Sequence, residues 1–200
     1  SARVPPTPPA GCDYNDFQVP EEFSGALNPG VYCGGLKIDD DDDVNVTFNP
    51  GIYFIRDGRL EILDEARVQG DNVSFYFYGD NAELLIAGDA RVNLSAQVTG
   101  PMAGILMWHD VNATGSAQFL IKSGNVDELV GTIYLPSGEF IGEIAGGGDI
   151  AESSAYTAII AEKVTLKNSA NLVLNSDYAA TNVPVPAGLS NTGGYVALRQ

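Results

Sequence analysis

The chain has 200 residues, 44% of them hydrophobic, and this length and composition suit one domain with a single core. Its 26 acidic residues against 10 basic ones give a formal net charge of −16 at pH 7. Because this charge repels nucleic acid and anionic membranes, we expect neither as a partner. The sequence has no run of 18 apolar residues and no signal-peptide pattern at its start, so we expect no membrane contact by this fragment itself.

The first 26 residues lack a regular pattern, and we expect them to form a Pro-rich linker followed by a cap. Residues 4–9 read Val-Pro-Pro-Thr-Pro-Pro, which is typical of a stiff linker in a longer chain. From residue 11 onward, Tyr14, Phe17 and Phe23 alternate with acidic residues. Aromatic side chains of this kind can cover the open end of a core, so residues 1–26 are predicted to include an irregular N-terminal cap.

Cys12 and Cys33 are the only two cysteines, and 21 residues separate them. An isolated pair without other metal-ligand residue types nearby predicts a disulfide that fastens the cap to the structure that follows. Such a bond would stabilise the fold by on the order of 3 kcal/mol in the chain-entropy model, and it would require an oxidising compartment. The alternative is a pair of reduced cysteines buried in the core.

The stretch from residue 28 to residue 96 repeats nearly the same sequence pattern three times. Two sets of apolar residues recur at intervals of 24 residues: Leu36, Leu60 and Leu84, and Val44, Val68 and Val92. A unit of this size cannot bury its apolar face alone, so neighbouring copies must stack and share a core. Apolar residues alternate within each copy, and Gly, Pro, Asn and Asp interrupt the chain too often for helices. The pattern therefore predicts an all-β fold, a right-handed parallel β-helix.

Turns and strands of the predicted coils follow in order along the chain. Asn-Pro-Gly at residues 28–30 and at residues 49–51 supplies tight turns, since Pro fixes φ and Gly accepts positive φ. Later strands are predicted at residues 73–78, 104–108, 119–121, 131–135, 139–141, 158–161 and 164–166. These make about six or seven coils over residues 27–182. Residues 183–200 would form a C-terminal extension, in which the segment 195–198 can pair or pack at the far end.

Several motifs, taken in order, bear a resemblance to a known family. They read NPGVYCGG, NPGIYFIRDG, NVSFYFYG, VNLSAQVTGPMAGILMW, GTIYLPSG and TAIIAEKVTL. Over roughly residues 27–175 this order resembles the C-terminal β-helical region of TadG-like proteins of the Flp (tight adherence) pilus-assembly system. The most specific parts are the two Pro-Gly-x-Tyr turns, Cys33-Gly34-Gly35, the crossover at residues 95–104 and Tyr134-x-Pro136.

The resemblance implies a bacterial cell-envelope protein, periplasmic or extracellular, that is anchored by a membrane segment upstream of this fragment. It implies a role in pilus assembly or surface attachment, with pilus-assembly or surface proteins as partners. The family supplies no catalytic residues. The run of five aspartates from Asp39 to Asp43 departs from the family's usual appearance.

No catalytic arrangement stands out, and we expect that the protein is not an enzyme. His109 is the only histidine, so a Ser-His-Asp arrangement would have to use it, and no spacing singles out a nucleophile. Because His109 follows Trp108 at a strand end, it is expected at the surface or the rim. Comparison with β-helical enzymes that act on polysaccharides rests on the fold alone, which does not give function.

Asp39, Asp41 and Asp43 are the candidate metal ligands. Their spacing begins like an EF-hand loop, but Val44 stands where that loop needs glycine and Pro50 where it needs glutamate. Adjacent carboxylates repel one another and would gain from a cation. The aspartate run therefore allows two interpretations, a weak calcium site and a solvated turn without any cofactor.

Stepping by 24 residues also aligns charges on the outer surface. One predicted column contains Asp41, Glu65 and Asp89, and a second contains Asp43, Arg67 and Arg91. Strands stack about 4.8 Å apart, so the arginines would offset the acidic residues near them. We read this pattern as a structural charge ladder.

The strand at residues 73–78 is rich in aromatic residues. Alternation places Phe75 and Phe77 on one side and Tyr76 and Tyr78 on the other, so one set is expected in the core. The other set would be exposed and could stack on sugars or contact a partner, although core packing is favoured here and for Tyr32, Tyr53 and Tyr134.

Two functions from different classes follow. The first is a non-enzymatic structural or adhesive module of a pilus-assembly envelope protein, which presents a rigid surface to partner proteins or a substratum. The second is a small β-helical carbohydrate-binding or carbohydrate-active domain, for which surface glycans would be partners. In either case the longer loops between residues 100 and 154 are the expected place for a site, and the stretch 138–154 is the expected mobile loop.

Overall fold

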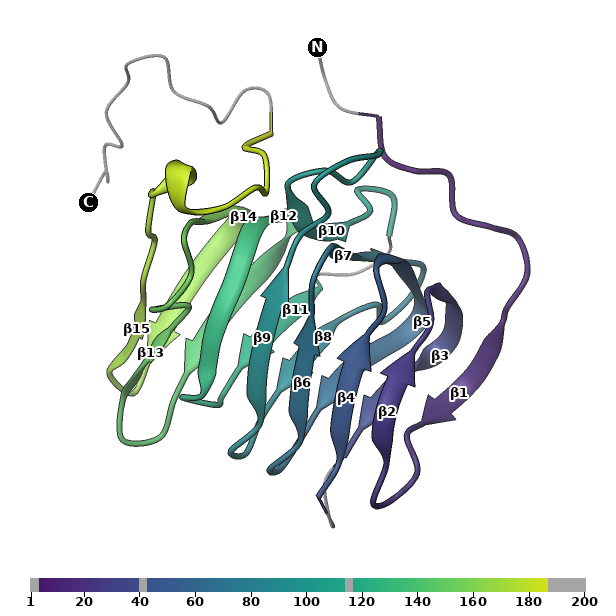
Figure 1. The fold of residues 1–200 in the computed structure, drawn as a ribbon, viewed down its shortest axis with the longest axis horizontal. Coiled ribbons are helices and arrows are strands. Elements are labelled where there is room, and N and C mark those ends of the chain that lie inside the picture. The colour runs from purple at the N-terminus through teal and green to yellow at the C-terminus, as the bar shows by residue number, and fades with distance from the viewer. Residues whose placement is uncertain (1–3, 40–42, 114–116, 187–200) are drawn as a thin grey trace.

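The computed structural model describes residues 4–39, 43–113 and 117–186, and these form a parallel β-solenoid of about six turns (Figure 1). The predicted all-β parallel solenoid is thus confirmed. The strands are β1 (Tyr14–Gln18), β2 (Ser24–Leu27), β3 (Gly30–Ile38), β4 (Asn45–Phe48), β5 (Gly51–Ile62), β6 (Arg67–Gly70), β7 (Val73–Tyr78), β8 (Leu84–Ile86), β9 (Arg91–Ser95), β10 (Ile105–His109), β11 (Gln118–Ile121), β12 (Val126–Glu143), β13 (Gly148–Ile150), β14 (Thr157–Lys167) and β15 (Ala170–Leu172). A short 3-10 helix, η1 (Tyr178–Ala180), follows β15.

Three faces enclose the core, and every named strand pair is parallel. The first face stacks β1, β3, β5, β7, β10, β12 and β14. The second face stacks the later parts of the long strands with β8 and β11. The third face stacks β2, β4, β6, β9 and the start of β12, and β13 pairs with β15 beyond it. Because strands turn from face to face, the inward side chains of all three meet in one interior.

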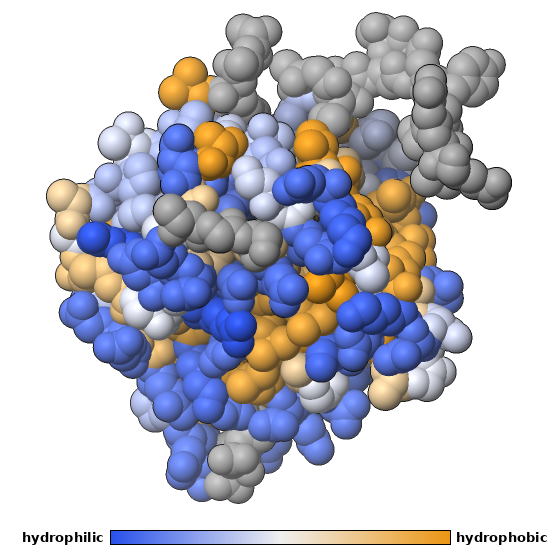
Figure 2. All heavy atoms as spheres, turned by 180° about the vertical axis from the view of Figure 1, so that it is seen from behind, coloured by the Kyte–Doolittle hydropathy of each residue, from blue (hydrophilic) through white to orange (hydrophobic). Residues whose placement is uncertain are grey.

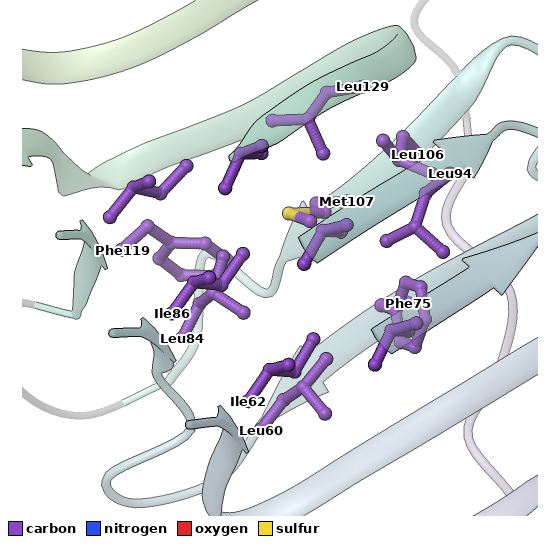
Figure 3. Packing of buried hydrophobic residues seen from close by; sticks show 14 of the residues in the cluster. Leu60, Ile62, Phe75, Leu84, Ile86, Leu94, Leu106, Met107, Phe119 and Leu129 are labelled. Carbon is purple, nitrogen blue, oxygen red and sulfur yellow. The ribbon is translucent and has the colours of Figure 1, made fainter. Parts of the chain in front are cut away.

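The predicted leucine column lies in this interior. Leu36 pairs with Leu60 and Leu60 with Leu84, as the interval of 24 residues predicted. Phe119 and Phe140 extend the column through the later coils, and both are fully buried. Figure 3 shows how the labelled residues of successive strands point into the shared core. The second-face strands predicted at residues 119–121 and 164–166 therefore occupy the expected positions.

The predicted valine column was wrong by two residues in its first member. On the third face Val68 pairs with Val92, but its partner in the preceding coil is Val46 rather than Val44. Ten residues separate Leu36 from Val46, whereas eight separate Leu60 from Val68. The corner between β3 and β4, which contains the aspartate run, is therefore two residues longer, and this shifts the register of β4.

Residues 11–26, where we expected an irregular cap, contain β1 and β2. Strand β1 pairs with β3 and β2 pairs with β4, so this segment forms an additional coil. Tyr14 stacks on Tyr32 with 4.5 Å between ring centroids, and Phe17 lies in register with Leu36. Both aromatic rings pack against the core cluster, so the first coil also covers the N-terminal end of the interior.

The predicted disulfide is present. Cys12 bonds to Cys33 of β3, with 5.8 Å between the two Cα atoms. Next to it, the Asp13 amide donates to the Val31 carbonyl, and the Val31 amide donates to Asp13 Oδ2. The disulfide and these hydrogen bonds together hold the start of the chain on the first face. Since such bonds persist in oxidising surroundings, this one indicates a non-cytoplasmic compartment.

Aspartates with positive φ form the corners between the first two faces. Asp16 and Asp57 have φ values of 44° and 52°, and each lies below a glycine of the next coil, Gly34 or Gly79. A Cβ atom at either glycine would lie 2.1 Å from the aspartate Oδ1, so no other residue fits there. Asp57 Oδ1 also accepts a hydrogen bond from the Asp80 amide (2.9 Å), which ties one corner to the next.

The C-terminal end of the solenoid differs from the N-terminal end. Strand β14 pairs with β12 on one side, and no other described strand pairs with it. Among the described residues, four of the six exposed large hydrophobic side chains belong to this last coil: Val164, Leu166, Leu174 and Tyr178. Seen from behind, apolar residues gather in the middle of the molecule and toward the edge of this coil on the right (Figure 2).

Candidate functional site

The third face carries the most regular polar surface of the described chain. Its strands β2, β4, β6 and β9 lie side by side at the front of Figure 1. In β4, β6 and β9 one valine of each strand points inward, and its neighbours on both sides point outward. The outward side chains, which we call the polar face, are Asn45, Thr47, Arg67, Gln69, Arg91 and Asn93.

The parallel register of the strands arranges the residues of the polar face in two columns. Asn45, Arg67 and Arg91 form one column. Thr47, Gln69 and Asn93 form the other. These six side chains, with Ser24 and Gly25 of β2, line a shallow groove that crosses the strands. Because neighbouring strands lie about 4.8 Å apart, the groove offers the same kinds of donor and acceptor at a regular spacing.

Hydrogen bonds hold part of the polar face in place. Gln69 Nε2 donates to Thr47 Oγ1 at 3.1 Å, and Asn45 Nδ2 donates to the Asp43 carbonyl at 2.9 Å. Arg67 Nη1 lies 3.5 Å from Asp43 Oδ1, and 42% of the Arg67 side chain and 89% of the Asp43 side chain are exposed. Since exposed ion pairs of this kind are weak, Arg67 remains available to a ligand.

The two arginines lie side by side on an otherwise strongly acidic protein. Arg67 and Arg91 are direct neighbours in register, as the 24-residue interval predicted. Asp43 does not belong to their column, because Asn45 occupies that position. No ion pair joins Arg91 to another of the described residues. Two adjacent guanidinium groups repel each other, so an anionic group that bridges them would be bound favourably.

The predicted metal ligands are only partly described. Asp41 lies outside the described residues. Asp39 forms an ion pair with Lys37, and Asp43 approaches Arg67. Within residues 4–39, 43–113 and 117–186, no three His, Cys, Asp or Glu side chains come together as a metal site would require. A weak calcium site at this corner stays a prediction.

His109 is buried, so its expected position at the surface or rim was wrong. Only 1% of the residue is exposed, and its ring lies 6.1 Å from that of Phe119. Its Nδ1 atom makes no hydrogen bond within the described part of the chain. Burial lowers the pKa of the imidazole, while the negative charges of Asp110 and Glu83 oppose this effect. The ring is therefore a neutral part of the core that a substrate cannot reach.

The burial of His109 predicts a pH dependence of stability. Its pKa in the folded state lies below the unfolded value of about 6.5, so the unfolded chain binds more protons at acidic pH. We expect the free energy of unfolding to fall as the pH is lowered below about 6.5, and His109→Phe to reduce this dependence. Urea unfolding of both proteins between about pH 7.5 and about pH 5.5 measures the slopes, and equal slopes would contradict the assignment.

The aromatic strand β7 contributes to packing on both of its sides. Phe75 and Phe77 point into the core, as core packing predicted. Tyr76 points outward but is only 1% exposed, because Phe54, Trp108 and Met102 pack around it. Its hydroxyl donates to Asp110 Oδ2 at 3.0 Å. This ring therefore cannot serve as an open platform for sugars.

The later coils contain fewer loops than we expected. The segment 138–154 includes the end of β12, a short turn and β13, so most of it belongs to the stacked structure. A second depression lies at this corner and is lined by Lys122, Asn125, Glu143 and Gly148 among others. Lys122 and Lys167 both approach Glu143, at 3.8 and 3.3 Å. These charges pair with one another and leave the polar face as the better candidate.

The sequence contained a signal for the polar face that we did not use. The segments Asn45-Val46-Thr47, Arg67-Val68-Gln69 and Arg91-Val92-Asn93 repeat a polar-Val-polar triplet. The triplet alternates as a half-buried strand does, and its three copies stack in the structure. The charge ladder predicted from the 24-residue interval includes the two arginines but not the amide side chains that lie beside them.

In the described part of the chain, no helix has the length and apolar character to cross a membrane. Comparisons of the chain with protein-family models, with curated proteins and with solved structures found no match.

Proposed function

We propose that this chain is a non-enzymatic structural and adhesive module that presents its polar face to a partner protein or a substratum. Following the resemblance in its sequence, we place it in a cell-envelope protein of Flp-pilus assembly. The observation that carries the proposal is the in-register stacking of Arg67, Gln69, Arg91 and Asn93 along a groove. The disulfide supports a location outside the cytoplasm.

Rigidity makes this surface suitable for presentation. The backbones of β4, β6 and β9 are hydrogen-bonded to both neighbours, and their central valines are buried in the core. A ligand would therefore meet side chains whose spacing is already fixed, which lowers the entropy lost on binding. Extended chains with repeated polar groups match such a surface best.

The groups of the polar face also favour a second candidate, a carbohydrate-binding domain. Amide side chains such as Gln69 and Asn93 donate and accept hydrogen bonds, and they suit sugar hydroxyls. Arg67 and Arg91 would select glycans with carboxylate or sulfate groups, because guanidinium binds such anions through two parallel hydrogen bonds. The protein-binding and glycan-binding functions thus use the same surface and differ in the ligand.

We expect that Arg67→Ala/Arg91→Ala weakens binding at least about tenfold, since hydrogen bonds to charged groups contribute about 1.5–3 kcal/mol each. Binding is measured by biolayer interferometry against purified pilins of the source organism and against an array of acidic and neutral glycans. Binding of pilins alone supports the first candidate, and binding of acidic glycans alone supports the second.

Arg59→Ala/Lys122→Ala is the matched control, because it removes two positive charges from surfaces outside the polar face. If both double variants weaken binding equally, net charge explains the effect and the polar face is not the site. Incubation with acidic polysaccharides, with and without calcium, tests for bond cleavage, which would contradict a non-enzymatic module.

A further inference from the structure

The last coil exposes side chains that occupy core positions. Val164 lies in register with the buried Phe140, and Leu166 with Gly142. Yet Val164 is 48% exposed and Leu166 is 46% exposed, because no further described coil follows them. At the opposite end, Tyr14 and Phe17 of the first coil pack against the core. Within the described part of the chain, the interior is therefore covered at the N-terminal end and open at β14.

The charges of β14 do little to protect this edge. Proteins commonly blunt a strand edge with lysine side chains that reach into water. Here Lys163 pairs with Glu139 at 2.9 Å and Lys167 with Glu143 at 3.3 Å, and both acidic residues belong to the neighbouring strand β12. A hydrogen bond from Thr165 and the charge of Lys163 lower the pKa of the Glu139 carboxyl. At the start of this 11-residue strand the Thr157 amide donates to the Asn175 carbonyl at 3.2 Å, and no described strand pairs with that edge along the rest of β14.

We propose that β14 pairs antiparallel with β14 of a second copy of this chain, about a two-fold axis between Glu162 and Lys163. The sequence of the strand is self-complementary about this point. Glu162 of each copy would face Lys163 of the other, so the pairing brings two pairs of opposite charges together. The two open cores would then close over each other.

The side-chain pattern of β14 selects this register. Ile159 and Ala161 lie in register with buried residues of β12, and so do Val164 and Leu166. On each side of the centre the inward positions lie two residues apart in the sequence. Across the centre, Ala161 and Val164 lie three residues apart. An axis between Glu162 and Lys163 therefore places Ala161 opposite Val164, and Ile159 opposite Leu166, all pointing inward. A shift by one residue would place inward side chains opposite outward ones, which a buried face excludes.

Sedimentation equilibrium of the full 200-residue chain tests the proposal at concentrations from about 1 to about 100 μM, the range of ordinary protein association. We expect a monomer–dimer equilibrium. Glu162→Lys should weaken the dimer at least about tenfold, because it places like charges opposite each other. The double variant Glu162→Lys/Lys163→Glu places opposite charges across the axis again and should recover part of the association, since it also removes the ion pair of Lys163 with Glu139. Glu65→Lys, an exposed residue at another corner, is the control with the same change of charge.

A second variant tests the apolar contact. Leu166→Asp should abolish the dimer, and it should leave the monomer folded because nearly half of Leu166 is already exposed. Circular dichroism of the variant confirms the fold. A monomer at all concentrations would overturn the proposal, as would a dimer that Glu162→Lys leaves unchanged. If only a chain that ends at Pro186 dimerises, the protein's own C-terminal residues cover this edge, and the second copy is ruled out.

Discussion

Replacing both Cys12 and Cys33 with serine is expected to lower the free energy of unfolding by about 3 kcal/mol, because the disulfide restricts the unfolded chain. The bond closes a loop that contains the whole of β1 and β2, so its loss frees the first coil before the others. Urea unfolding followed by linear extrapolation measures the change. The midpoint should move to a lower urea concentration. The slope of the free energy against urea concentration reports any change in the surface that unfolding exposes.

Local hydrogen bonds provide the control for this measurement. The backbone and side chain of Asp13 both bond to Val31, next to the disulfide. If the double serine variant loses less than about 1 kcal/mol, a typical value for one hydrogen bond, these contacts rather than the disulfide hold the first coil. Asp13→Ala with the cysteines intact then measures how much the side-chain hydrogen bond of Asp13 contributes to the free energy of unfolding, because the backbone bond remains.

The interval of 24 residues was sufficient to predict the fold because it arises from packing. Leu36, Leu60 and Leu84 occupy one column since each coil must return its chain to the same inward position. The interval failed for Val44, because corner length does not depend on the core. Two additional residues between one strand and the next cost little free energy, so the sequence can lengthen this corner without disturbing the strands.

The environment of individual side chains was harder to predict than the strands. His109 follows an apolar strand and could end it at the surface, but the chain continues the stack and buries the ring beside Phe119. Tyr76 points outward as alternation required, and it is covered by Met102 from a segment that lies far along the chain. Alternation gives the direction of a side chain and does not tell what covers it.

For the polar face, alternation likewise gives the direction of each side chain but not how side chains of neighbouring strands line up. Its residues alternate with buried valines, so their outward direction could be read from the sequence. Their arrangement as one surface depends on register, and the register of β4 depends on the length of the corner at the aspartate run. The N-terminal cap likewise proved to be a coil, in which Tyr14 and Phe17 repeat the inward positions of Tyr32 and Leu36. This coil lacks the Asn-Pro-Gly turn that marks the next two coils in the sequence.

Phe119→Ala is expected to destabilise the protein by about 3–5 kcal/mol, as large-to-small substitutions in a packed core do. Phe119 is fully buried in the leucine column, and its ring lies 4.7 Å from that of Phe77. The coils above and below are fixed by their backbone hydrogen bonds, so the core cannot collapse to fill the cavity. Urea unfolding in dilute solution measures the loss for the monomer.

Val164→Ala is the matched control, because Val164 occupies the same column two coils later. With 48% of the residue exposed, its truncation should cost less than about 1 kcal/mol in the monomer. A similar loss at both positions would mean that the last coil is covered in solution. The cost should rise at high protein concentration if a second copy covers β14, since the dimer would then bury Val164. The same pair of variants therefore tests both the core and its open end.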